Sequence, residues 1–381
     1  MDKKIKNILI LQSAVMRGYR NKLFDWLSKK FITFFIFTNL SNDIELPESL
    51  RFINTTSKNN IYKYFIILRY LLFYDYHILI THAESNESII AWLVVKARKK
   101  KLLLWSEHWT YPVLITDEKT KNYFSKYFKI IKWQLKHFIT KRMQRSTNQF
   151  IAIGEKAFNH YLNNVPKERI ICAPKYVEKY PEDTSNMRIQ NFLEKNQQRK
   201  TILYSGRLMK IKGVEYLIKA FSELEKKFNN AMLLIIGEGE LKTDLEMLSK
   251  ELDVKNIEFW DWLKPEELNL LYKNCYVFVQ PSIFIDYRYE VNGYSIYECM
   301  AYAKPIITTD AVGASPQFVK HGYNGFVVES ANSEALMDVL VTLIESEDLA
   351  GIMGQRSKNI YDTEISLSGQ IAAFRKAIQT I

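Results

Sequence analysis

The sequence predicts an α/β protein of two doubly wound units, each a parallel sheet covered by helices on both faces. Two observations support this fold class. Short, uninterrupted apolar runs rich in β-branched residues alternate with longer stretches of helical character. The runs also fall into two series separated by a polar stretch, and 381 residues are enough for two domains.

The first series predicts five strands in the N-terminal half, at Ile5–Leu11, Phe31–Thr38, Ile78–Thr81, Lys101–Trp105 and Gln149–Ile153. The first run follows several lysines, as in a signal peptide. It is too short for one, and no small-residue cleavage site follows soon, so we interpret it as a buried strand. The longest apolar stretch, Tyr64–Ile80, is interrupted by Arg69, Asp75 and His77, which argues against a transmembrane helix.

The second series predicts six strands, at Thr201–Ser205, Met232–Gly237, Ile257–Phe259, Val277–Gln280, Pro305–Thr309 and Gly325–Val328. Between the two series, residues 176–199 contain Pro181 and a polar run, which favours a linker with a surface helix. We therefore expect an N-terminal domain at 1–175, a C-terminal domain at 200–360 and a final helix at 361–381.

The charge is distributed unevenly between the two halves. Residues 1–200 carry 35 Lys and Arg against 17 Asp and Glu, whereas residues 201–381 carry 18 against 25, and the whole chain is at +11. A basic half usually meets an anionic surface, such as phospholipid, nucleic acid or an acidic acceptor. The three cysteines are far apart in sequence, which argues against a disulfide framework or structural zinc and fits a reducing compartment.

Two glycine-containing turns follow strands of the C-terminal half. Ser205-Gly206-Arg207 leads through Lys212-Gly213 into an amphipathic helix, an arrangement in which α/β proteins present backbone amides to phosphate. Arg207 and Lys212 would add the positive charge that a leaving diphosphate needs. Gly237-Glu238-Gly239 ends another strand, where an ordinary turn and a base-binding turn are equally compatible with the sequence.

The most informative stretch runs from Glu290 to Glu298, preceded by Pro281-Ser282 and followed by Lys304-Pro305. Seven residues separate the two glutamates. We place Glu290 in a loop around Gly293, and Glu298 about one turn into the helix that follows. Carboxylates accept hydrogen bonds from sugar hydroxyls, and helix-start amides suit a phosphate. The stretch therefore predicts a site for a phosphorylated sugar.

These segments, in this order, resemble the donor-binding domain of the retaining GT-B glycosyltransferases of family 4. The resemblance covers Thr201–Val328 and includes Ala301 and the His321-Gly322…Asn324-Gly325 pattern. It implies the GT-B fold, in which two Rossmann-like domains face each other across a cleft. It also implies that the final helix packs back on the N-terminal domain.

The resemblance assigns roles by position. Arg207 and Lys212 would hold the donor diphosphate, Glu290 would contact the transferred sugar, and Glu298 would bind the ribose. The remaining donor-binding candidates are Gly206, Gly237, Glu238, Asn292, Gly293, Tyr294 and Ser295. Catalysis would rest on Glu290, Arg207, Lys212 and His108. The nucleotide-sugar is a co-substrate, and neither a cofactor nor a metal is expected.

The sequence departs from the family pattern at several positions. The family usually has an aromatic residue at Asn292, a glycine at Ala303 and a glutamate at Gln317. The segment Ile285–Tyr289 is also unusual. These departures affect the identity of the donor sugar more than donor binding itself.

The N-terminal half resembles the family only loosely. Its acceptor-side candidates are Arg17 and Gly18 after the first strand, His82 after the third, and His108 after Lys101–Trp105. In the family a histidine so placed reaches the transferred sugar, and the leaving phosphate takes the acceptor proton. Catalysis would then depend on positioning and on neutralising the diphosphate.

A basic stretch, Lys119–Arg145, carries nine Lys and Arg and no acid, interleaved with aromatic and aliphatic residues. This pattern is typical of a helix that binds an anionic membrane, although a helix packed on its own domain with a solvated basic face would look similar. We favour the membrane, and we expect a cytoplasmic protein at the inner face of the membrane.

The sequence thus favours a hexosyl-type glycosyltransferase that acts on a sugar or lipid-linked sugar, in surface polysaccharide or glycolipid assembly of the bacterial type. A sugar-nucleotide epimerase with the GT-B fold is one alternative, although such enzymes need further acid/base residues. A non-enzymatic nucleic-acid-binding protein is another, but no nucleic-acid module is recognisable and we expect no nucleic-acid partner.

Overall fold

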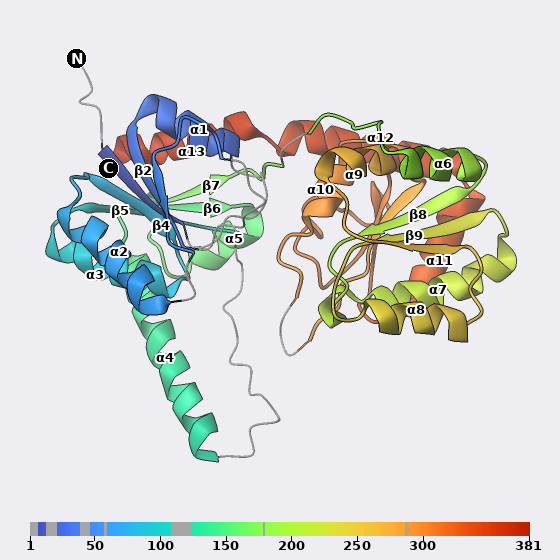
Figure 1. The fold of residues 1–381 in the computed structure, drawn as a ribbon, viewed down its shortest axis with the longest axis horizontal. Helices are drawn as coiled ribbons and strands as arrows, with labels where there is room; N and C mark the ends of the chain where they lie inside the picture. Colours follow the sequence, from blue (N-terminus) through green and yellow to red (C-terminus); the bar gives the residue numbers. More distant parts are fainter. Residues whose placement is uncertain are drawn as a thin grey trace. The chain divides into compact units, whose positions relative to one another are not determined.

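The computed structural model describes residues 7–12, 21–38, 46–56, 59–107, 123–177, 180–285 and 289–381, with backbone alone at 21 and 123–129. The chain forms two compact units. The first comprises Met1–Glu178 together with Ser366–Ile381, and the second comprises Lys179–Ile365. The two doubly wound units that the sequence predicts are therefore confirmed (Figure 1).

In its described part, the first unit contains a parallel sheet of seven strands in the order β3-β2-β1-β4-β5-β6-β7. The strands are β1 (Asn7–Gln12), β2 (Ile32–Phe37), β3 (Phe52–Asn54), β4 (Ile78–His82), β5 (Lys101–Ser106), β6 (Gln149–Ile153) and β7 (Ile170–Ala173). The sequence did not predict β3 and β7. Both are edge strands, of three and four residues. β3 holds only two apolar residues, whereas β7 is apolar throughout, so its run was visible in the sequence and was overlooked.

Alternate residues of these strands face two hydrophobic cores. Ile8 and Ile10 of β1 point toward α1 (Asn21–Lys30) and α13 (Leu367–Thr380), while Leu9 and Leu11 point to the opposite face. That second face is covered by α2 (Asn60–Phe73), α3 (Asn86–Ala97), α4 (Tyr123–Arg145) and α5 (Glu155–Tyr161). The alternation follows from the two-residue period of a strand, and it explains why both sides of each strand are apolar.

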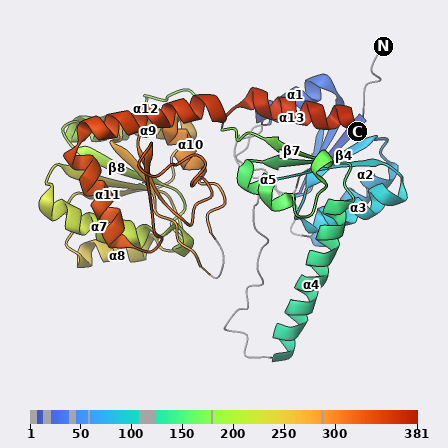
Figure 2. The same cartoon turned by 180° about the vertical axis from the view of Figure 1, so that it is seen from behind.

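The C-terminal segment contains two helices rather than one. Helix α12 (Glu347–Glu364) ends in the second unit, and α13 begins after Ser366, whose hydroxyl caps the new helix by accepting from the Gly369 amide at 3.1 Å. The Ser366 amide donates to the Lys175 carbonyl at 2.9 Å, and Phe374 of α13 is buried in the first unit. The last helix thus completes the core of the first unit (Figure 2).

The second unit contains, among its described residues, a parallel sheet of six strands in the order β10-β9-β8-β11-β12-β13. They are β8 (Lys200–Ser205), β9 (Ala231–Ile236), β10 (Ile257–Trp260), β11 (Val277–Gln280), β12 (Ile306–Thr309) and β13 (Gly325–Val328), close to the predicted bounds. The helices are α6 (Met187–Asn196), α7 (Val214–Lys227), α8 (Lys242–Glu251), α9 (Pro265–Asn274), α10 (Tyr294–Met300), α11 (Ser333–Glu345) and α12.

The segment expected as a linker, 176–199, holds α6. Its Ile189 and Phe192 are buried, and the Phe192 ring meets the Trp260 ring edge-on at 5.2 Å. The helix is therefore a packed part of the second unit. Among the described helices, none is both long and apolar enough to cross a membrane.

Candidate active site

The predicted donor-binding residues lie where the strand order of the second sheet reverses. Strand β8 is paired with β9 on one side and with β11 on the other, so connections leave β8 and β11 toward opposite faces. Gly206 and Arg207 follow β8, and Pro281 and Ser282 follow β11. In open α/β sheets, ligands bind beyond the carboxyl ends of the strands at such a switch point.

Two glycines allow neighbouring turns to approach closely at this edge. A Cβ atom on Gly237 (φ +148°) would lie 1.9 Å from the carbonyl oxygen of Gly206. One on Gly213 (φ +63°) would lie 2.1 Å from the carbonyl oxygen of Pro281. Both positions therefore require glycine for space as well as for backbone conformation. The turns after β8, β9 and β11 are held in one compact group.

Lys212 and Glu290 form an ion pair at the centre of this group, although 78 positions separate them in the sequence. Lys212 precedes α7, and Glu290 is held in place by its backbone, which donates to the Ala311 carbonyl at 2.9 Å. Both side chains are largely buried, at 13% and 19% exposure. The residues predicted to hold the diphosphate and the sugar are thus brought into direct contact.

The pKa of Glu290 reflects two opposing effects. Burial raises the pKa, but the Lys212 ammonium and the amides of Gly293 and Asn292 lower it more, so the net shift is downward. The Gly293 amide donates to the second carboxylate oxygen at 3.1 Å. Glu290 is therefore an ionised acceptor at neutral pH. The Glu290 carboxylate accepts hydrogen bonds from amides at the start of α10, which the sequence analysis had suggested as phosphate ligands.

Glu298 lies on α10, next to a buried tyrosine of α9. The Tyr272 hydroxyl donates to Glu298 Oε2 at 2.9 Å. Burial, together with the Glu298 charge, raises the pKa of Tyr272 well above its ordinary value, so Tyr272 stays a donor. The Ser295 hydroxyl donates to the Ser205 carbonyl at 3.1 Å and joins α10 to the end of β8. Tyr272 thus holds the Glu298 carboxylate, and the helix that carries Glu298 is joined to β8.

The remaining donor-side candidates surround this pair of glutamates. Arg207 is exposed, and its carbonyl accepts from the Tyr204 hydroxyl at 2.9 Å. Glu238 is also exposed, Asn292 is buried, and the Tyr294 ring lies 6.2 Å from that of Tyr297. The second unit therefore places Lys212, Glu290 and Gly293 in direct contact, and it carries the other donor-side candidates on the neighbouring turns and on α10.

In the first unit, His82 is the one acceptor-side candidate among the described residues, since Arg17, Gly18 and His108 lie outside them. His82 ends β4, beside the β1–β4 reversal of the first sheet. Its Nδ1 lies 2.6 Å from Glu84 Oε2. The Tyr161 hydroxyl donates to the other Glu84 oxygen and lies 3.0 Å from Ser106 Oγ.

Two residues of this group were not predicted from the sequence, namely Glu84, which contacts His82, and Tyr161, which contacts Glu84. Glu84 stands only two residues after His82, and this proximity was an available signal. Tyr161 comes from α5, 77 positions from Glu84, and no local pattern connects the two. The result is an imidazole–carboxylate–phenol group at the edge of the sheet where the first unit would meet a ligand.

With both sheet edges described, comparisons with known proteins show what the second unit is similar to. Residues 186–360 match the family Glycosyl transferases group 1. The matched segment contains Lys212, Tyr272, Glu290 and Glu298, so the residues that meet at the switch point all lie in the group 1 region.

Two curated relatives are also named as glycosyltransferases. An uncharacterized glycosyltransferase of Haemophilus influenzae is 31% identical over 160 residues, which are 42% of this chain and 43% of that protein, so less than half of the relative is spanned. An uncharacterized glycosyltransferase of Methanocaldococcus jannaschii is 25% identical over 313 residues, or 81% of this chain and 76% of the relative.

Among solved structures, Anabaena HepE in complex with UDP and glucose matches the whole chain. The TM-score is 0.70 at 13% identity, and the match covers 99% of this chain and 100% of HepE. With its two parallel α/β sheets, the chain has the GT-B fold that the sequence predicted.

One departure from the family 4 pattern has a visible backbone consequence. Ala303, where that pattern has glycine, adopts a left-handed conformation with φ +55°. This conformation costs a non-glycine residue roughly 1–2 kcal/mol. The turn before β12 therefore keeps its shape against the local preference of its residue.

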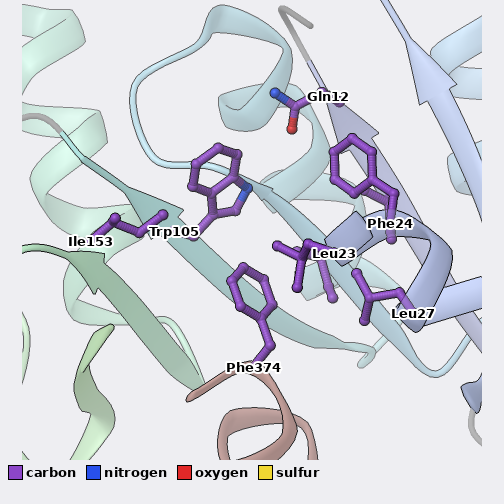
Figure 3. A pocket seen from close by; sticks show the side chains of 9 residues that line it. Gln12, Leu23, Phe24, Leu27, Trp105, Ile153 and Phe374 are labelled. Atoms are coloured by element: carbon purple, nitrogen blue, oxygen red, sulfur yellow. The ribbon is translucent and has the colours of Figure 1, made fainter. Parts of the chain in front are cut away.

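A small cavity in the first unit differs in character from the candidate site of the second unit. It is lined by Ile10, Gln12, Leu23, Phe24, Leu27, Ile80, Trp105, Ile153 and Phe374 (Figure 3). Gln12 is the one polar side chain of that lining. The walls come from the sheet, α1 and α13, so the cavity is an interior space of the core.

Proposed function

We propose that this protein is a retaining glycosyltransferase that transfers a hexose from a nucleoside-diphosphate sugar to a sugar or lipid-linked sugar. The observation that carries the proposal is the Lys212–Glu290 ion pair beside the Tyr272–Glu298 hydrogen bond, at the switch point of a group 1 domain. Together these groups offer a cation for phosphate and two carboxylates for hydroxyls.

Each group has a chemical task in donor binding. Glu298, fixed by Tyr272, accepts hydrogen bonds from the two ribose hydroxyls. Glu290 accepts hydroxyls of the transferred sugar, and Lys212 and the exposed Arg207 neutralise the diphosphate. The two cations would provide the charge that a divalent metal supplies elsewhere, so we propose metal-independent transfer. The UDP and glucose bound to HepE support a nucleotide-sugar donor.

The electrostatics explain how transfer could proceed without a protein nucleophile. As the sugar–phosphate bond breaks, negative charge grows on the diphosphate, and Lys212 and Arg207 are placed to stabilise it. When the donor binds, the Lys212 ammonium would exchange its ion pair with Glu290 for one with the diphosphate. The Glu290 carboxylate could then accept hydrogen bonds from the sugar. We propose that the acceptor attacks the face from which the diphosphate leaves, and that the phosphate takes the acceptor proton.

We also propose that Lys119–Arg145 contacts an anionic membrane at the cytoplasmic face, where a lipid-linked acceptor for polysaccharide or glycolipid assembly would lie. Ile131, Leu135 and Phe138 of α4 form an exposed apolar stripe. The side that packs on the domain is a different one, at Met143. Because the stripe is not the side that packs on the domain, it is available to contact a membrane.

A donor screen tests the main proposal. Thermal unfolding of the wild type would be measured with UDP-, GDP-, ADP- and TDP-sugars, alongside Glu298→Ala and the surface control Glu251→Ala. One nucleotide should stabilise the wild type and the control, and Glu298→Ala should lose most of that stabilisation. If no nucleotide stabilises the wild type, the proposed function is wrong.

The stereochemistry needs its own measurement. Proton NMR of the product during turnover would show whether the new glycosidic bond has the anomeric configuration of the donor. Retention is the expected outcome. Inversion would contradict the retaining mechanism while leaving the donor site intact. Isomerisation of the donor sugar without transfer would instead identify an epimerase.

A further inference from the structure

Helix α2 is apolar on two opposite sides, and only one of them is covered. Ile67 and Leu71 are fully buried in the core beneath the sheet. Ile61, Phe65 and Phe73 are exposed to 81%, 62% and 82%. A helix that is apolar all round is normally enclosed by its own protein, so the outer side of α2 requires an explanation.

The exposed residues form an ordered stripe. At 3.6 residues per turn, Ile61, Phe65 and Leu72 project within an arc of about 40°, and Arg69 adjoins them. Tyr62 and Phe73 extend the same side. Isolated exposed apolar residues are common, but contiguous apolar patches usually mark an interaction surface.

Exposed apolar residues also lie on the neighbouring helices. Helices α2, α3 and the C-terminal end of α4 pack on the same face of the sheet, with α3 in contact with both of the others, while the rest of α4 extends beyond the domain (Figures 1 and 2). Their outer sides carry nine exposed large apolar residues, namely Ile61, Tyr62, Phe65, Leu72, Phe73, Leu93, Ile131, Leu135 and Phe138. We call this surface the α2–α4 face. The second unit exposes six such residues in its described part, spread over several elements.

The charge of the α2–α4 face selects among possible partners. In sequence, the three helices carry ten Lys and Arg and a single acid, Glu87. Glu87 is already paired with Lys63 at 2.8 Å. A second copy of this chain would bring one basic surface against another, which repulsion opposes. A partner must therefore be both anionic and apolar, as an anionic bilayer is at its headgroup–acyl boundary.

We propose that α2 is an apolar anchor that inserts its outer stripe into an anionic bilayer while α4 binds the headgroups. The inference rests on the membrane partner proposed above and deepens it, because it adds a contact that charge alone does not provide. Headgroup attraction weakens with salt, whereas burial of apolar side chains does not. Binding should therefore have a salt-resistant part that belongs to α2.

The test is co-sedimentation of the full chain with vesicles of phosphatidylcholine alone or with added phosphatidylglycerol, at low and high salt. The anchor variant is Phe65→Ser with Phe73→Ser, and the charge variant is Lys132→Gln with Lys136→Gln. The control is Ile352→Ser, an exposed apolar position on α12 of the second unit. Thermal unfolding would confirm that all variants fold.

We expect the anchor variant to lose about tenfold in binding to anionic vesicles at both salt concentrations, because two large apolar groups are removed. The charge variant should lose binding at low salt and match the wild type at high salt. The control should bind as the wild type does. Wild-type binding by the anchor variant would overturn the proposal, as would a wild-type dimer in light scattering that the anchor variant abolishes.

The same samples would be assayed for stabilisation by the nucleotide found in the donor screen. A folded anchor variant that still responds to the nucleotide but has the expected weaker binding to vesicles supports the anchor. Vesicle binding without any nucleotide response would leave the anchor standing and refute the proposed enzyme. Failure of the two proposals is therefore distinguishable.

Discussion

The two sheets share one topology but have differently organised edges. In both, the strand order reverses beside the first strand of the unit, between β1 and β4 and between β8 and β11. At the second reversal, glycines bring three turns into contact around the Lys212–Glu290 pair. At the first, the described groups are His82, Glu84 and Tyr161, which converge from β4, the turn after it and α5. Common topology places a site, and local residues decide what it binds.

The largest effect should come from the ion pair of the second sheet. Lys212→Met removes a cation aimed at the diphosphate, and we expect kcat to fall about 10²–10³-fold. Lys210→Met, an exposed lysine two residues earlier, is the matched control and should stay near wild type. Equal losses in both variants would mean that the charge of the segment matters and the pair does not.

The close approach of Gly237 to Gly206, which is found at the edge of the second sheet, is the next feature to test. Gly237→Ala should destabilise the second unit by about 2–4 kcal/mol, because the new Cβ would meet the Gly206 carbonyl. Gly351→Ala, on the exposed side of α12 with nothing within 4 Å, should instead stabilise by about 0.5–1 kcal/mol. Denaturant unfolding measures both. A neutral Gly237→Ala would show that the turns can separate.

Two tyrosines allow the two sheet edges to be compared directly. Tyr272→Phe removes the donor to Glu298, and Tyr161→Phe removes the donor to Glu84. Loss of one such hydrogen bond should raise the KM of the bound ligand by roughly 3–10-fold. We expect Tyr272→Phe to raise KM for the nucleotide-sugar and Tyr161→Phe to raise KM for the acceptor. If either change moves both constants equally, the assignment of one ligand to each edge is wrong.

The pH dependence of stability gives the smallest effect. Since the pKa of Glu290 is lower in the folded protein, its contribution is complete above the ordinary glutamate value of 4.5 and is lost as pH falls through the folded value. Lys212→Met removes the main cause of the lowering, so its loss of stability on acidification should be smaller than that of Lys210→Met, and the stabilities of the two variants should converge as pH falls. Identical acid limbs in urea unfolding would contradict this linkage.

Most of the fold could be predicted because buried parallel strands leave continuous apolar runs. Strands β9 and β11 of the second sheet are fully buried examples, whereas β3 of the first sheet is a three-residue edge strand with little signal. The turns that carry the donor-side candidates were predictable because tight turns demand glycine, and glycine is visible in sequence. The donor-binding role of these residues stays a prediction. That Glu290 would pair with Lys212, and Glu84 with Tyr161, depends on contacts between distant segments.

The outer side of α2 was missed for another reason. Its apolar residues surround the whole helix, so the sequence shows hydrophobicity without showing which residues the sheet would cover. The basic pattern of Lys119–Arg145 was visible because it lacks acids. The membrane interpretation of that pattern stays a prediction until vesicle binding is measured.

The position of helix α13 at the end of the chain affects the order in which the two units can fold during synthesis. Its Phe374, Ala377 and Ile378 fill the core of the first unit, yet the ribosome makes them after every residue of the second unit. During synthesis, the apolar face of the first unit that α13 will cover therefore stays exposed, whereas the second unit is contiguous in sequence and can already fold. A chaperone that shields this face during translation would affect the yield of the first unit more than that of the second.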